Sequence, residues 1–347
     1  MSMSLKDDII NSSDVQSRSA LLQMITGYWT SQAIYVAAKL GIADLLMDGP
    51  KSCDLLAKST KTSQRELFRL LRFLASIGIF AELEDAFFEL TPLAAYLQSE
   101  TPSSLRSLVI YYGEETYQPW GSILHSIKTG ETAFNHVHKC GVFQYFAQHP
   151  ESAAVFNQAM TEYAAEETIA VINAYDFSKF DKIVDVGGGQ GSFMATILKA
   201  NDEPKGILFD LPQGVRGAKE YLETAYLMER CEIIEGDFFE SIPSGGDAYI
   251  FKNIFVNWTD GRCIDILKNC HHAMAENGKL IIIEVIVISP KNAPSFSKLF
   301  DLHMLVMTGG RGRTEAEFQA LFAATGFNLT NIISTESPVS IIEGVRI

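Results

Sequence analysis

The sequence predicts an α/β protein in two parts: an N-terminal helical unit that ends in a β-hairpin, and a C-terminal doubly wound, mostly parallel sheet. Three observations predict this fold. In the first hundred residues, apolar side chains recur at three- and four-residue spacing, as on amphipathic helices. After Phe177, short β-branched segments alternate with helical stretches, which is typical of parallel sheets. The last two of these segments leave no room for a helix between them, so we expect an antiparallel C-terminal hairpin.

Residues 1–100 are predicted to form a winged-helix-like unit. Apolar residues at helical spacing occupy residues 34–42 and 67–77, and residues 80–90 then alternate around an acidic turn, which predicts a small hairpin. A DNA-binding unit of this shape would be basic. This hairpin instead carries acidic side chains, namely Glu82, Glu84, Asp85 and Glu89. We therefore favour a dimerisation role, with DNA binding as the alternative.

Residues 101–175 are predicted to be a helical linker that contributes to a substrate pocket, because this segment is rich in aromatic residues. Residues 176–347 are predicted to form the Rossmann-like catalytic domain. Its strands are expected at Lys182–Val186, Gly206–Asp210, Cys231–Ile234, Asp247–Lys252, Lys279–Val287, Asn328–Ser334 and Val339–Val345.

Composition excludes several classes of protein. The chain has 347 residues, 47% of them hydrophobic, and a formal charge of −14, so we expect a folded protein that does not bind nucleic acid. Residues 1–14 do not resemble a signal peptide. The longest apolar stretch, residues 280–288, is far shorter than the ~20 residues of a membrane helix. We expect a cytoplasmic protein without membrane attachment.

The cysteines predict free thiols and no metal. They are five in number, far apart, and form no Cys-x-x-Cys pair, as expected in a reducing compartment. Cys270, His271 and His272 are consecutive, and consecutive residues on a helix point about 100° apart and do not converge on one ion.

The most specific motif is Asp185-Val-Gly-Gly-Gly-Gln-Gly191, which lies between the first predicted strand and a helix. Gly187, Gly189 and Gly191 allow a tight turn whose backbone approaches a ligand. A dinucleotide-binding turn requires Gly-x-Gly-x-x-Gly, and this motif has Gly-x-Gly-x-Gly after an acid. Asp185 is suited to a ligand with an ammonium group and no phosphate, such as the methionine part of S-adenosylmethionine (SAM).

Two more acids end consecutive predicted strands. Asp210 ends the second strand, where a carboxylate can accept both ribose hydroxyl protons. Asp237 follows the third strand, and Phe238 beside it offers an aromatic face for adenine. Either acid alone could equally cap a helix. Together they favour a nucleoside-containing cofactor.

The sequence resembles the small-molecule O-methyltransferases of plants and bacteria, the family of the caffeic-acid and hydroxyindole enzymes. Beyond the glycine motif, the matching segments are Phe156–Met160, Phe209–Pro212, Gly236–Phe239, Asn257–Asp260 and Gly309–Thr314. The resemblance implies a class I methyltransferase fold, SAM as cofactor and an intertwined homodimer. It implies cofactor contacts from Asp210 and its neighbour Leu211, from Asp237 and Phe238, from Lys252, and from Phe156 and Met160.

The sequence departs from the family at the catalytic base. Plant-type enzymes have a His two residues before the Trp that matches Trp258, and here that position is Val256. Of the two carboxylates that would orient the His, one matches Glu284, but the other matches Gly312. The Val256-Asn257-Trp258 segment resembles bacterial anthracycline-type methyltransferases, a branch that includes members with other chemistry.

We therefore expect SAM-dependent methyl transfer to an oxygen of an aromatic or polyketide-like molecule in secondary metabolism, driven by positioning of the reactants. The alternative is an enzyme that keeps SAM but performs hydroxylation or cyclisation. His303 is the best replacement base, and we group it with Glu284 and Asn257 as catalytic candidates. The candidate substrate pocket contains Val256, Trp258, Trp120 and Met307.

Overall fold

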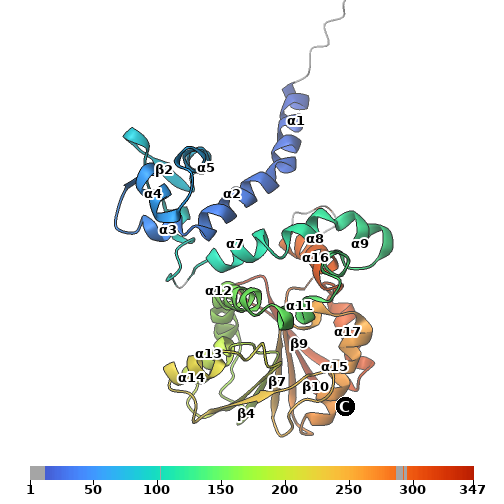
Figure 1. Cartoon of the computed structure of the whole chain (residues 1–347). Coiled ribbons are helices and arrows are strands. Elements are labelled where there is room, and N and C mark those ends of the chain that lie inside the picture. Colours follow the sequence, from blue (N-terminus) through green and yellow to red (C-terminus); the bar gives the residue numbers. More distant parts are fainter. Residues whose placement is uncertain (1–11, 102, 287–291, 293–294) are drawn as a thin grey trace, which may run out of the picture. The chain divides into compact units, whose positions relative to one another are not determined.

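The computed structural model describes residues 12–101, 103–286, 292 and 295–347. The chain divides into two compact units, with the division between Gly113 and Glu114. Figure 1 shows the helices and strands of each unit. Among the described residues, no helix is both long and apolar enough to cross a membrane.

The N-terminal unit is helical with one small sheet. Its helices are α1 (Ser12–Ile25), α2 (Gly27–Lys39), α3 (Ile42–Leu45), α4 (Cys53–Thr60), α5 (Gln64–Ser76), α6 (Pro92–Ala95) and α7 (Arg106–Gly113). The predicted hairpin is confirmed: β2 (Phe80–Glu82) and β3 (Phe87–Leu90) pair antiparallel across a short 3-10 turn, η1 (Glu84–Ala86). A two-residue strand that was not predicted, β1 (Lys51–Ser52), pairs with the other edge of β3.

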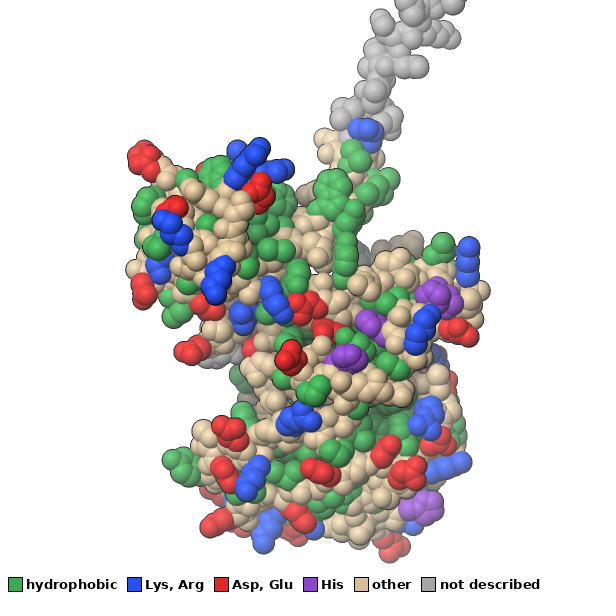
Figure 2. Space-filling view, in the orientation of Figure 1, with side chains coloured by type: hydrophobic (Ala, Val, Ile, Leu, Met, Phe, Trp, Pro, Cys, Tyr) green, Lys and Arg blue, Asp and Glu red, His purple; other side chains and the backbone are tan. Residues whose placement is uncertain are grey.

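One surface of the N-terminal unit is strongly apolar. Large hydrophobic side chains along α1 and the start of α2 are exposed, as Figure 2 shows; they are Leu21, Leu22, Met24, Ile25, Tyr28 and Trp29. Exposed apolar surface of this kind marks an interaction site. We refer to these six residues below as the α1–α2 apolar face.

The C-terminal unit begins with helices and continues into a seven-stranded sheet. The helices are α8 (Tyr117–Gly121), α9 (Ile123–Thr129), α10 (Ala133–His138), α11 (Val142–Gln148) and α12 (Pro150–Ala174). The strands are β4 (Lys182–Val186), β5 (Lys205–Asp210), β6 (Cys231–Glu235), β7 (Ala248–Lys252), β8 (Lys279–Glu284), β9 (Phe327–Ser334) and β10 (Ser340–Arg346).

The order of the strands is β6-β5-β4-β7-β8-β10-β9. The first five are parallel, while β10 is antiparallel to both β8 and β9. The predicted doubly wound sheet with an antiparallel hairpin is therefore confirmed. The strand predicted at residues 279–287 ends at Glu284 in the structure, and Val287 lies outside the described residues.

Helices cover both faces of the sheet (Figure 1). One hydrophobic core lies under α12, α13 (Ser192–Ala200) and α14 (Ala218–Thr224), and the other under α15 (Asp260–Ala273) and α17 (Glu315–Ala323). Neighbouring residues of β4 belong to different cores: Ile183 lies in the first core and Val184 in the second. Successive side chains of a strand point to opposite faces, so a strand covered on both sides is apolar throughout.

Candidate functional site

The glycine motif forms the turn between β4 and α13. Gly187, Gly189 and Gly191 have φ values of 76°, 57° and 81°, in the left-handed region that favours glycine. Gly188 is required for another reason. A Cβ there would come within 2.5 Å of both Asp185 Oδ2 and Leu208 Cδ1, so the turn packs tightly on β4 and on the neighbouring strand β5.

Asp185 is buried beside this turn at the end of β4. Its Oδ2 atom is inaccessible and has no hydrogen-bond partner in the part of the chain that the structure describes. Burial, and then the negative charge of Asp210, raises the pKa of Asp185 to about 7, and the positive charge of Lys252 opposes the rise. A buried carboxylate oxygen without a partner is costly. Asp185 therefore fits a ligand that brings a hydrogen-bond donor or a positive charge, such as the ammonium group of SAM.

Asp210 connects the end of β5 to the glycine turn. Its Oδ2 accepts from the Gly189 N–H at 2.9 Å, and its Oδ1 accepts from the Leu211 N–H at 2.6 Å. Burial raises the pKa of Asp210, and these two N–H groups oppose the rise. A carboxylate has about four acceptor positions, so Asp210 retains capacity for ligand hydroxyl groups.

Asp237 and Phe238 follow β6. Oδ1 of Asp237 accepts from the Phe239 N–H at 2.8 Å, so this carboxylate shapes its own turn. Phe238 is buried, and a Cβ on Gly187 would lie 3.8 Å from its ring. The structure thus brings Phe238 next to the glycine turn, and the adenine contacts of both residues remain predictions.

Lys252 ends β7 and forms a buried ion pair that was not predicted. Its Nζ lies 2.9 Å from Oε2 of Glu167 on α12, and both side chains are less than a tenth exposed. The Asn253 amide donates to the same oxygen at 3.2 Å, and Asn253 has a φ of 55°, which is unusual for a non-glycine residue. Glu167 has no local sequence signal because it lies within a long helix.

The first half of α12 carries Phe156 and Met160. Phe156 stacks on Phe146 of α11 with centroids 4.6 Å apart, and Met160 is half-buried. Asn157, between them, donates from its amide to the Gln213 carbonyl at 3.1 Å. Gln213 follows the Asp210 segment, so α12 is fixed beside the cofactor motif.

Val256, Asn257 and Trp258 lie in the segment that follows β7. A single 3-10 turn, η2 (Phe255–Asn257), buries Val256. The Asn257 amide donates to the Asn253 carbonyl at 2.9 Å, so it stabilises its own loop. Trp258 packs on aromatic rings, with centroid distances of 5.5 Å to Phe143 and 4.7 Å to Phe239.

Glu284, at the end of β8, accepts from the Val256 N–H at 2.8 Å. Burial raises the pKa of Glu284 to about 7, opposed by this N–H and by the charge of Arg313. In this structure the carboxylate therefore holds the main chain at the position where the family has its base.

His303 lies on α16 (Phe296–Met307) and pairs with Trp120 of α8. The indole Nε1 donates to His303 Nδ1 at 2.9 Å. Since an indole N–H only donates, Nδ1 is the unprotonated nitrogen and the ring proton is on Nε2. Burial lowers the pKa of His303 to about 4. Phe300 stacks on the same ring at 6.3 Å, whereas Met307 is fully buried within the chain.

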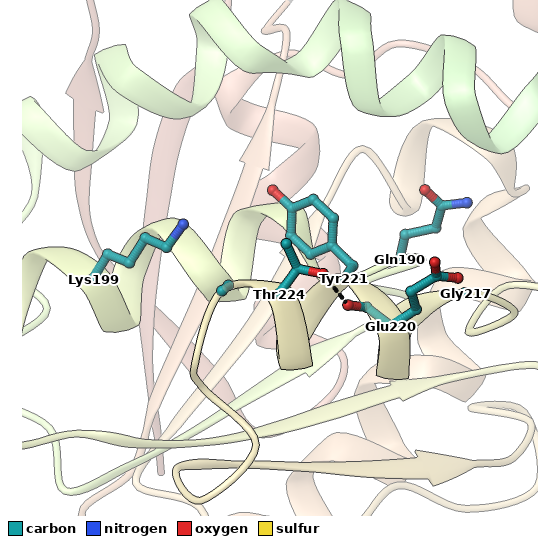
Figure 3. Close-up of a pocket in the computed structure, with 7 residues that line it drawn as sticks. Gln190, Lys199, Gly217, Glu220, Tyr221 and Thr224 are labelled. Carbon is teal, nitrogen blue, oxygen red and sulfur yellow. Dashed lines mark hydrogen bonds between the residues drawn. The ribbon is translucent and has the colours of Figure 1, made fainter.

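A separate shallow pocket lies beside the glycine turn, between α13 and α14 (Figure 3). It is lined by Gln190, Lys199, Gly217, Glu220, Tyr221, Thr224 and Ala225. None of these residues is among the predicted site residues, and we assign the pocket no role.

The fold and this site define a cofactor-dependent methyltransferase, and the chain belongs to the O-methyltransferase family. Residues 120–328 match the family's O-methyltransferase domain, and residues 22–100 match its dimerisation domain. The protein is thus a SAM-dependent enzyme with a domain for self-association.

Individual relatives match over nearly their whole length. The chain is 47% identical to a phenazine O-methyltransferase of Lysobacter antibioticus, over 94% of this chain and 95% of that protein. The structure of the mitomycin 7-O-methyltransferase MmcR matches with a TM-score of 0.91 and 34% identity, covering 97% of this chain and 99% of that one. Human N-acetylserotonin methyltransferase in complex with SAM matches with a TM-score of 0.89 and 26% identity over the same shares.

Proposed function

We propose that this enzyme transfers the methyl group of SAM to a hydroxyl group of a planar, ring-containing metabolite, and that it does so by positioning the reactants, without a side-chain base. The observation that carries the proposal is the hydrogen bond from Trp120 to Nδ1 of His303. It engages the one nitrogen at which neutral His303 could accept a proton. Val256 occupies the family's base position, so neither place provides a general base.

Without a side-chain base, the hydroxyl group of the substrate must lose its proton through its own acidity. A simple phenol has a pKa of ~10, so about one molecule in a thousand is ionised at pH 7, which costs ~4 kcal/mol. A hydroxyl group conjugated to an electron-poor ring ionises far more readily. Relatives that act on phenazine and mitomycin support a substrate of this kind.

The other residues of the site would bind the cofactor and orient the substrate. When bound, SAM supplies a methyl group on a positively charged sulfur. The glycine turn, Asp185 and Asp210 would bind the cofactor, and the aromatic rings of Phe143 and Trp258 would orient a planar substrate and exclude water. The transfer forms one O–C bond, breaks one S–C bond, and leaves S-adenosylhomocysteine (SAH) and a proton that passes to water.

We also propose that the enzyme is a homodimer. The α1–α2 apolar face lies partly within the segment that matches the family's dimerisation domain. A second copy of the chain would cover this surface, because burying apolar side chains is the main favourable term in association.

Incubation with methyl-labelled SAM and a hydroxyphenazine tests the proposal, with N-acetylserotonin as a less acidic comparison. We expect labelled product and stoichiometric SAH, with faster turnover of the more acidic hydroxyl. NMR of the product distinguishes O- from N-methylation. Consumption of the substrate without transfer of label would instead support hydroxylation or cyclisation.

A further inference from the structure

The Gly309–Thr314 segment matches the family, yet the proposed mechanism gives it no task. It connects α16 to α17 and lies against the Phe255–Trp258 turn. A Cβ on Gly310 would collide with main-chain atoms of Val256, Asn257 and Trp258. The two backbones are therefore in direct contact, and only glycine permits this approach.

Arg313 binds both ends of the same turn. Its side chain is fully buried, and its guanidinium donates to the Phe255 carbonyl at 2.8 Å and to the Trp258 carbonyl at 2.7 Å. Two further bonds, of 3.0 and 2.9 Å, reach Oδ1 of Asp260. A planar fork of five donors can satisfy all these acceptors at once, and a lysine ammonium cannot.

Glu284 contacts the same turn. Its carboxylate accepts the N–H of Val256, while Arg313 takes the carbonyl groups of the flanking residues. Arg313 also favours the ionised form of Glu284. Within the turn, the Trp258 N–H donates to the Phe255 carbonyl at 3.0 Å. Glu284 and Arg313 add an acceptor for the Val256 N–H and a donor for the Phe255 and Trp258 carbonyl groups, so side chains complete the hydrogen bonding of the turn.

We propose that Arg313 is a positioning residue for methyl transfer. With Gly310, it holds the Phe255–Trp258 turn in one geometry, so that Val256 and Trp258 form a fixed wall of the substrate site. This inference rests on the proposed function, because an enzyme without a base depends on orientation, and a displacement of about 1 Å can cost a hundredfold in rate.

Arg311 provides a matched control two residues earlier. It also bonds to Asp260, at 2.8 Å, and it pairs with Glu317. Its side chain is 42% exposed. Substitution of Arg311 by lysine therefore changes the same type of residue on the same carboxylate without removing the bonds to the turn.

The test compares Arg313→Lys with Arg311→Lys in the full-length enzyme. We expect kcat to fall ten- to a hundredfold in Arg313→Lys while the KM for SAM stays within twofold, and both constants to stay within twofold in Arg311→Lys. Hydrogen exchange of peptides covering residues 255–258 should accelerate only in Arg313→Lys. An unchanged kcat, or unchanged exchange, in Arg313→Lys would overturn the inference.

A second pair of variants covers the case in which Arg313→Lys does not fold. Gly310→Ala places a methyl group against the main chain of the turn without altering any charge. Gly261→Ala is the control, because a Cβ at Gly261 meets no atom within 4 Å. We expect the same selective loss of kcat in Gly310→Ala and none in Gly261→Ala; equal activity of the two rejects the inference.

The failure of the inference is distinguishable from failure of the proposed function. If wild-type enzyme methylates the hydroxyphenazine and the variants do so equally well, only the role of Arg313 is wrong. If wild-type enzyme transfers no methyl group to any hydroxylated ring compound, the proposed function is refuted, and so is the role of Arg313 as a positioning residue for methyl transfer. Hydrogen exchange then still decides whether Arg313 holds the turn.

Discussion

Glu167 and Lys252 are 85 residues apart in the sequence, yet their side chains meet at 2.9 Å. The pair joins the second half of α12 to the carboxyl end of β7, and Asn253 reinforces it. Because α12 also carries Phe156 and Met160, this carboxylate, together with the hydrogen bond from Asn157 to the Gln213 carbonyl, fixes the helix relative to the strand end at which SAM is expected to bind.

The first prediction concerns this pair. Glu167→Leu should leave the buried ammonium of Lys252 unpaired, a loss of about 3–5 kcal/mol for a buried ion pair, and should lower both the melting temperature and the affinity for SAH. Calorimetry and thermal unfolding measure the two effects. Glu166→Leu is the control, since Glu166 is exposed on the same helix. Equal behaviour of the two variants would show that the pair has no such role.

Asp210→Ala should weaken SAH binding by at least tenfold. The variant loses the acceptor for the Gly189 and Leu211 N–H groups, as well as the proposed ribose contacts, each worth roughly 1.5–3 kcal/mol when made to a charged group. Calorimetry provides the measurement, with exposed Asp202→Ala as the control. Undiminished affinity in Asp210→Ala would refute its assignment to the cofactor site.

The pH–rate profile should follow the substrate and not His303. The pKa of His303 is lowered to about 4, so its ring is neutral throughout the working range, and the kcat profile should lack an inflection near 6.5. His303→Ala should lose less than tenfold in kcat, from altered packing alone. A hundredfold loss together with a vanished inflection would instead identify His303 as a general base.

Glu284 should make stability depend on pH. Its pKa is raised to about 7 in the folded protein, against ~4.3 when unfolded, so the folded state binds the proton more tightly. Stability therefore falls as pH rises from the unfolded to the folded pKa. Glu284→Gln has no titrating group at this position. As pH rises from 4 to 8, its free energy of unfolding should therefore increase relative to that of wild type by on the order of 2–4 kcal/mol.

Thermal unfolding at pH 5, 6.5 and 8 and fixed protein concentration checks this prediction. Asp185, whose pKa is also raised, and His303, whose pKa is lowered, contribute to both proteins alike. Glu276→Gln changes an exposed carboxylate and should shift the midpoint equally at all three values. A difference between Glu284→Gln and wild type that does not vary with pH would contradict the assignment.

The α1–α2 apolar face should be required for dimerisation. Ile25→Glu places a charge where we expect two chains to meet, and burying an unpaired charge is costly. Light scattering should report a dimer for wild type and for Gln23→Glu, and a monomer for Ile25→Glu. A monomeric wild-type protein at micromolar concentration would disprove the proposal.

Local patterns in the sequence predicted most of the fold. The alternation around Phe80–Leu90 and the spacing of the C-terminal strands depend on neighbouring residues, so periodicity revealed them. The two-residue strand β1 escaped prediction because it is too short to show a period. Its pairing partner, β3, lies 35 residues further on, since Ser52 pairs with Phe87.

The site was less predictable than the fold. The acids at strand ends could be anticipated because parallel strands bring their carboxyl ends to one edge. The long-range contacts of the site could not be anticipated. Glu167 meets Lys252, Trp120 meets His303 and Arg313 meets Phe255 through tertiary packing, across 85, 183 and 58 residues. For the same reason, the sequence placed Glu284 among the catalytic candidates without showing that it binds the backbone of Val256.

The position of β10 affects how the chain folds during synthesis. β10 follows β9 in the sequence but lies between β8 and β9 in the sheet. A growing chain that ends after β9 therefore leaves β8 with an open edge and β9 without its neighbour. Ile341 and Ile342 of β10 are fully buried, one in each hydrophobic core, so both cores stay incomplete until β10 leaves the ribosome. Exposed strand edges are prone to pair with other chains, so premature termination between β9 and β10 should yield insoluble protein.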